Sequence, residues 1–487
     1  MNNSKLVNLL RTFSKHEIKE LEKIVASPYF NRGRNYAPLL KQLKKFHPKF
    51  DDPKMTPEYI FLKMYPGKKI NMQTIWNMSS ALLKMAEEFL ALGSLKKKGF
   101  LREQQIAEEL HSRKLPQYYS KKLDEMENEL ERPGISPNYF HFKMQLEGAR
   151  KEYYYIEEKQ SLIPEHDDKE GEYLILYFLW SIVRVLNDMH VHSFMFNASY
   201  DVNVTHEFIK NVQLKKIINY CNDKKYGYAW LMEMLYNQIM MILEPDDGKY
   251  FSSLKELFEK NYNRFTDEAK LNWVTSLINY CSAKRDYSSR KTLFEIHKFE
   301  LKEGMAFTGK YLSKAHYLQI LKNACAIKEN EWIKNFINEC APKLKPSYQK
   351  SMRALGLAFL YLNLKHYDKV FESLGKIRFI DIKDKLTVKF VYIRAYYESK
   401  ETEALLSHID TTLHFINNNS ASIRSDIALN YRNSLKAIKK LIAMGENNEY
   451  SDLEHVKKTI EGNTDMVLGD WLLEKIDELS INLKNIS

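Results

Sequence analysis

The chain has 487 residues, too many for one ordinary core, so several domains or a repeat array are expected. Gly (16) and Pro (13) are scarce, which argues against turn-rich β architectures and glycine-rich phosphate loops. The net charge of +11 is unevenly placed: residues 1–102 hold 20 Lys or Arg against 8 Asp or Glu, and the remainder holds 54 against 55. The totals predict an all-α protein whose excess positive charge lies in the first fifth of the chain. Such a charge asymmetry is evidence about binding partners and not about the fold.

The first 95 residues predict a compact unit of four helices. Ser14 and Glu17 have the spacing of a capping box at the start of the first helix. Thr56 followed by Pro57 is typical of a helix start, and a long helix is expected over residues 71–95 after the turn PGKKIN. We expect three parts in the chain: a basic helical N-terminal module over 1–98, a helical middle region over 99–225 and helical repeats over 226–487.

The cations of the N-terminal module cluster around its turns, and two explanations stay open. One is a solvated surface; the other is contact with nucleic acid, because neutralising phosphates needs many cations on one side. The pair of helices over residues 56–95 resembles the helix-turn-helix of bacterial regulators that precede a tetratricopeptide-like domain. That resemblance implies that the polar face of the second helix meets the major groove, although the same helix could be buried instead. The candidate nucleic-acid contacts are Arg32, Arg34, Lys44, Lys45, Lys68, Lys69, Gln73, Asn77, Lys84, Lys96, Lys97 and Lys98.

The middle region predicts helices without a clear repeat. The acidic stretch EHDDKEGE is expected just before a helix that begins near Glu172, where carboxylates complement the helix N-terminus. The apolar run over 173–186 is too short for a membrane span and predicts a buried helix. No signal peptide is expected, and four scattered cysteines predict buried free thiols in the cytoplasm. No membrane partner is expected.

Helical hairpins with a period near 34 residues are the main pattern of the second half. Ala354, Leu357, Ala358, Tyr361 and Leu364 would share one face of a first helix, and Tyr367, Val370, Leu374 and Ile377 one face of a second. A similar pair follows about 34 residues later, turning at SKE, and a second helix starts about 35 residues earlier at Trp332. Looser versions precede it back to residue 235, with one spacing of 45 between turn aromatics.

On these positions, residues 235–416 resemble tetratricopeptide-like helical repeats. The resemblance implies hairpins stacked as an α-solenoid, with the C-terminal helices as a cap. Such an array exposes a surface that binds extended peptides or another protein. The expected fold is therefore all-α: a solenoid of helical hairpins with a small basic N-terminal helical domain.

Candidate enzyme chemistry is weak. GMAFTGKY (304–311) has the spacing of a phosphate-binding loop, but Tyr311 stands where a Ser or Thr must hold Mg²⁺, and a helix is expected before it. His190 and His192, with His206 and Glu207 downstream, could suggest a metal, but two helical residues two positions apart project about 200° apart. No catalytic residue, cofactor or metal ligand is therefore predicted.

Three function classes stay open from the sequence. The favoured one is a non-enzymatic scaffold or adaptor that binds a protein or peptide on the solenoid surface. The alternative is a nucleic-acid-binding regulator that uses the basic N-terminal module, with the solenoid as a sensing or docking domain. The third is a helical enzyme whose site lacks a familiar signature.

Overall fold

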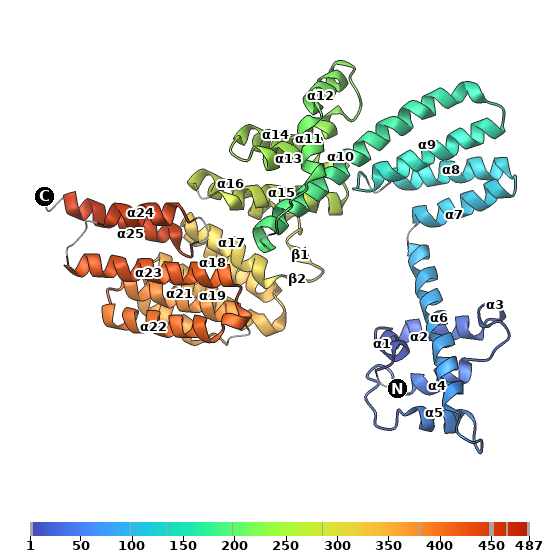
Figure 1. Cartoon of the computed structure of the whole chain (residues 1–487), viewed down its shortest axis with the longest axis horizontal. Helices are drawn as coiled ribbons and strands as arrows, with labels where there is room; N and C mark the ends of the chain where they lie inside the picture. The colour runs from blue at the N-terminus through green and yellow to red at the C-terminus, as the bar shows by residue number, and fades with distance from the viewer. Residues whose placement is uncertain are drawn as a thin grey trace. The chain divides into compact units, whose positions relative to one another are not determined.

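The structure is a computed structural model that describes residues 3–97, 99–132, 134–196, 198–284, 286–378, 381–447, 452–463 and 466–484. Within them it contains 25 α-helices and one short two-stranded hairpin, so the all-α prediction is confirmed (Figure 1). The chain divides into two compact units, Met1–Phe178 and Leu179–Ser487, which are described separately below. The three-part division expected from the sequence stays a prediction.

The first part of unit 1 forms its own hydrophobic core. The capping box at Ser14 is present as predicted: the Ser14 hydroxyl accepts from the Glu17 N–H, and the Glu17 carboxylate accepts from the Ser14 N–H at 2.7 Å. Thr56 likewise caps its helix by accepting from the Tyr59 N–H. Two further helices, the first and third, were not predicted from the sequence. The helices here are α1 Lys5–Arg11, α2 Lys15–Ala26, α3 Pro28–Asn31, α4 Ala37–Lys44, α5 Pro57–Met64 and α6 Met72–Lys97.

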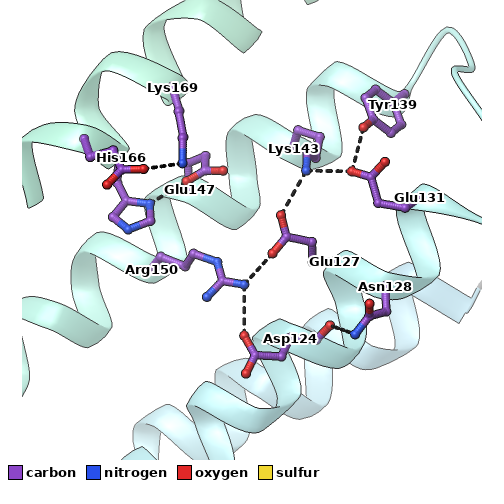
Figure 2. Close-up of polar contacts among 11 residues, drawn as sticks. Asp124, Glu127, Asn128, Glu131, Tyr139, Lys143, Glu147, Arg150, His166 and Lys169 are labelled. Atoms are coloured by element: carbon purple, nitrogen blue, oxygen red, sulfur yellow. Dashed lines mark hydrogen bonds and ion pairs between the residues drawn. The ribbon is translucent and has the colours of Figure 1, made fainter. Parts of the chain in front are cut away.

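The rest of unit 1 is tied together by charged side chains (Figure 2). The helices are α7 Gly99–Ser112, α8 Pro116–Glu131, α9 Tyr139–Ile156 and the first part of α10 Ile163–Phe196, preceded by the 3₁₀ turn η1 Gln160–Leu162. The Lys143 ammonium lies 3.0 Å from Glu127 and 2.9 Å from Glu131, and it is 5% exposed. Burial opposes its charge, but the hydrogen bonds that Lys143 donates to Glu131 and Glu127 outweigh burial and raise the pKa of Lys143. This network joins α8 to α9.

The acidic stretch before residue 172 differs from its prediction. Helix α10 begins at Ile163, so these carboxylates lie within the helix rather than before it. Their role is to pair with cations: Lys151 contacts Asp167 at 2.8 Å and also contacts Glu170. Glu165 lies in the first turn of α10, where its carboxylate complements the helix N-terminus as expected. The later carboxylates of the stretch lie beyond that turn, and two of them form ion pairs between α9 and α10 instead.

The apolar run within α10 is only partly buried. In unit 1, Leu174 and Ile175 are about half exposed, at 51% and 47%, so the prediction of a wholly buried helix is wrong on this face. In the described residues, one helix, Gln160–Ser193, is long and apolar enough to cross a membrane by length and composition alone. The expectation of no membrane partner stays a prediction.

Unit 2 is built mainly of consecutive helical hairpins, which occupy the green-to-orange part of Figure 1. Each of the hairpins predicted from residue 235 onward is present, and α19 packs on α17, α18, α20 and α21. The helices that precede and form the hairpins are α11 Val204–Asn211, α12 Leu214–Asp223, α13 Ala229–Leu243, α14 Gly248–Asn261, α15 Asp267–Ala283, α16 Tyr287–Lys302, α17 Lys314–Ala326, α18 Asn330–Cys340, α19 Pro346–Asn363, α20 Tyr367–Gly375, α21 Ile382–Glu398 and α22 Thr402–Asn418. Short 3₁₀ turns follow α14, α18 and α22.

The best-formed hairpin, α19–α20, corrects one detail of the predicted packing face. Val370, Leu374 and Ile377 of the second helix are buried as expected, but Leu364 is 41% exposed because it is the residue that ends α19. Gly356 packs most tightly: a Cβ added there would lie 2.8 Å from the Tyr317 Oη and 2.9 Å from the Ile337 Cγ1. Three helices therefore meet at a position where a side chain has no room.

The C-terminal helices pack on the last hairpin through a separate core. Trp471, Leu472 and Ile476 of the final helix are buried at 4%, 0% and 1% exposure. This arrangement follows from the apolar spacing of the final helix, which buries one face against its neighbours and leaves the other charged. The elements are α23 Ser425–Asn447, α24 Leu453–Glu461 and α25 Gly469–Lys484.

Candidate functional site

The segment GMAFTGKY is a β-hairpin. Strands β1 Phe307–Thr308 and β2 Tyr311–Leu312 pair antiparallel, and Gly309 takes the left-handed conformation (φ +62°) that the tight turn needs. A phosphate-binding loop must instead link a buried strand to a helix N-terminus. Helix α16 precedes the hairpin, as expected, and the insertion explains the long spacing of 45 residues in the repeat pattern.

His190 and His192 both lie on α10, which continues to Phe196. Because the helix has not ended, the two rings project from faces about 200° apart. His206 and Glu207 belong to a different helix, α11. The structure therefore does not bring His190 and His192 to one ion.

Another histidine cluster lies in the core of unit 2. The His297 Nδ1 and the His316 Nε2 contact the same oxygen of Glu300, at 2.6 and 2.7 Å, and His297 and Glu300 are almost fully buried. Burial raises the pKa of Glu300, but the hydrogen bonds from the two histidines outweigh it and leave the pKa below the usual value. Donor atoms around a tetrahedral Zn²⁺ lie about 3.3 Å apart, so Glu300 would have to retreat by about 0.6 Å before these residues could hold an ion. The arrangement is a hydrogen-bonded triad, and it links α16 to α17 across the hairpin insertion.

The structure brings together only some of the predicted nucleic-acid contacts. Gln73, Asn77 and Lys84 are exposed on one face of α6, and the Gln73 amide donates to the Asn77 side chain at 2.9 Å. Met78 and Leu82 occupy the buried face of the same helix. One side of the helix is therefore buried in the core and the other side exposes polar groups to solvent. Contact of this polar face with a major groove stays a prediction.

The remaining predicted contacts are spread over the module. Lys96 and Lys97 lie about 35 Å along α6 from Gln73 by helix rise, and Lys44 is paired with Glu22 at 2.7 Å. Lys98 lies outside the described residues. The others are exposed at turns or helix ends: Arg32, Arg34, Lys45, Lys68 and Lys69.

A hollow in unit 2 lies between the first helices of successive hairpins and the C-terminal helix. It has a volume of about 810 Å³ and is lined by α15, α16, α17, α19, α21, α23 and residues 466–477. Phe359, Leu362, Phe390 and Val391 supply apolar surface from α19 and α21, and Leu468 and Trp471 face them from the C-terminal segment. The hollow therefore joins apolar groups that are more than 100 residues apart in the sequence.

The acidic face of α25 is held in place by cations from the hairpins. Arg290 pairs with Asp470, and the Lys328 ammonium lies 3.8 Å from Glu474. Next to Asp470 on the same helix, the Trp471 indole N–H donates to Glu398 at 2.6 Å. Asp470 and Glu474, which face the hollow from α25, are therefore already matched by cations.

Two cations of the hollow have no such partner. Among the described residues, Lys322 on α17 and Arg394 on α21 form no ion pair, and the Arg394 Nε has no hydrogen-bond acceptor. Loss of hydration lowers the pKa of Lys322, and the nearby Lys383 lowers it further, although the Lys322 side chain keeps contact with solvent. Loss of hydration likewise lowers the pKa of Arg394, which the carboxylates of Glu398 and Glu474 offset only in part. Neither charge is compensated by an ion pair: Arg394 is partly buried, whereas Lys322 is exposed at the edge of the hollow.

Sequence reasoning did not find these two residues. The available signal was a single cation within a mainly apolar or aromatic stretch of a first helix: Lys322 within YLQILKNACA and Arg394 within FVYIRAYY. The sequence also held a signal for the histidine–glutamate triad, because His297 and Glu300 are spaced i, i+3 and therefore share a helix face. Its third member, His316, is brought in only by the hairpin.

No protein-family model, no curated protein and no solved structure matches this chain.

Proposed function

We propose that the chain is a non-enzymatic adaptor, with the hairpins of unit 2 stacked as a tetratricopeptide-like solenoid that binds a segment of another protein. The observation that carries the proposal is the hollow lined by the first helices of successive hairpins. It combines apolar side chains with polar groups that lack partners, which is the composition expected of a binding site. The described part of the chain supplies no nucleophile–base pair there, and the half-buried Cys325 thiol has its pKa raised to about 12 by burial, which makes it a poor nucleophile.

Filling the hollow should abolish partner binding. Peptides of random sequence would be selected by display on the full-length protein, and the affinity of the enriched peptides measured by fluorescence anisotropy. Ala326 lines the hollow and is exposed, so Ala326→Trp is expected to weaken binding at least tenfold by occupying the space. Asn335→Trp, at an exposed position of α18 outside the hollow, is the matched control and should leave affinity within twofold.

Two results would contradict the adaptor proposal. One is that no peptide is enriched above a helical protein of similar size. The other is that the enriched peptides bind Ala326→Trp as tightly as the unchanged protein, with circular dichroism showing that the variant is folded.

A second candidate function rests on the polar face of α6. Because Gln73, Asn77 and Lys84 are exposed together, we propose as the alternative that this face contacts duplex DNA. Full-length protein should then bind a labelled duplex near 0.1 M salt, and Lys84→Ala should reduce the slope of log affinity against log salt by about 1, the value of one phosphate contact. Lys19→Ala, an exposed lysine of α2, is the control. Equal slopes for the two variants, or no binding at that salt concentration, would rule the contact out.

A further inference from the structure

The charges around the hollow of unit 2 are not balanced. Of the acidic residues that line it, Asp470 pairs with Arg290, Glu474 lies near Lys328, and Asp477 contacts Lys457 at 2.9 Å. Lys322 and Arg394 remain as two cations without a carboxylate of their own. The hollow thus carries excess positive charge even though the chain outside residues 1–102 is almost neutral.

An uncompensated cation in a poorly hydrated place is unfavourable for the folded protein alone. Hydrogen bonds to charged groups are stronger than those between neutral groups, and a partly buried charge such as that of Arg394 gains most from an ionic partner. Both cations lie beside apolar surface: the Arg394 guanidinium is 5.9 Å from the Trp471 ring centre, and Lys322 projects from the same helix as Ala326. A ligand that satisfies them therefore needs carboxylates and apolar groups together.

We propose that the partner of this hollow is an acidic protein segment, whose carboxylates pair with Lys322 and Arg394 and whose apolar side chains cover the Phe359–Phe390 surface. The proposal rests on the adaptor function stated above and names the chemistry of its partner. The C-terminal helix illustrates the match, because α25 presents both acidic residues and Trp471 to the same cationic wall.

The two cations come from different first helices around the same hollow. Lys322 is on α17 and Arg394 is on α21, and α19 packs on both of these helices. Side chains of α17 and α21 can reach one another, because the Lys314 ammonium lies 2.8 Å from Asp384. One short acidic segment can therefore meet both cations, with its apolar residues against the neighbouring surface.

The test uses peptides selected on full-length protein. We expect the enriched sequences to carry two or more Asp or Glu together with apolar residues. Lys322→Gln and Arg394→Gln should each weaken binding at least tenfold, which corresponds to about 1.4 kcal/mol. The matched controls are Lys334→Gln on α18 and Arg353→Gln on α19, both exposed and outside the lining of the hollow, and each should stay within twofold.

The outcomes separate this proposal from the adaptor function. Enriched peptides that lack acidic residues, or that bind Lys322→Gln and Arg394→Gln unchanged while Ala326→Trp abolishes binding, would overturn the acidic partner and leave the adaptor function standing. Binding insensitive to Ala326→Trp would overturn both. Arg394→Lys serves as a further variant: it keeps the charge, so it should retain more affinity than Arg394→Gln if an ionic contact is made.

Discussion

Replacing Lys314 by methionine is expected to destabilise unit 2 by about 3–5 kcal/mol, the usual effect of removing one member of a buried ion pair. The Lys314 ammonium at the start of α17 lies 2.8 Å from Asp384 and 2.5 Å from Asp381, at the start of α21. The Asp384 side chain is 4% exposed, so the substitution leaves a carboxylate in the core without a cation. Urea unfolding followed by tryptophan fluorescence measures the loss.

A double variant tests the cause of this loss. Lys314→Met combined with Asp384→Asn removes the uncompensated charge, so it should be clearly more stable than the sum of the two single effects predicts. Lys376→Met is the control, because its pair with Glu372 is exposed at 64% and 67% and should contribute less than about 1 kcal/mol. Additive single effects would show that the pair is not the source of the stability.

Replacing Gly356 by alanine is expected to destabilise unit 2 by about 1–3 kcal/mol, because extra volume in a filled core forces neighbours to shift. The new Cβ would meet the Tyr317 Oη at 2.8 Å and the Ile337 Cγ1 at 2.9 Å, and both residues are fully buried. The Ala substitution improves helix propensity by about 1 kcal/mol, so a net loss would mean that packing outweighs propensity. The shift of the urea midpoint measures the effect, and Trp332 reports on this core.

Gly93 provides the matched comparison for Gly356. It also lies inside a helix, α6, but nothing comes within 4 Å of a Cβ added there. Gly93→Ala should therefore stabilise its own unit by up to about 1 kcal/mol. Equal effects at Gly93 and Gly356 would contradict the close helix packing described here.

The sequence predicted helices best where the signals are local. The capping box of Ser14 and Glu17, the Thr56–Pro57 start and the turns before Tyr367 and after Glu398 all fall where the structure has them. Each depends on groups within one or two helical turns, so a short stretch of sequence specifies it. The acidic stretch around Asp167 was placed wrongly because its partner, Lys151, is on another helix.

The sequence predicted less of the candidate site than of the helices. A repeat pattern predicts which residues are buried between helices, and it predicted Val370, Leu374 and Ile377 correctly. It does not say whether a cation such as Arg394 finds a carboxylate, because the answer depends on residues of α25 about 80 positions later. The polar face of α6 could be predicted from helical spacing, whereas the scatter of the other cations of the module could not.

By itself, the sequence determined that this protein is all-α, where most of its hairpins turn and that its excess positive charge belongs to the first 102 residues. Helix periodicity, capping and charge counts are properties of neighbouring residues, so no long-range contact is needed to recognise them. Only the tertiary structure decided that α25 packs beside the first helices of the hairpins. It also decided which charges there form ion pairs, and that Lys322 and Arg394 form none among the described residues. Pairing and hydration depend on distances between residues remote in sequence, and those distances exist only in the folded chain.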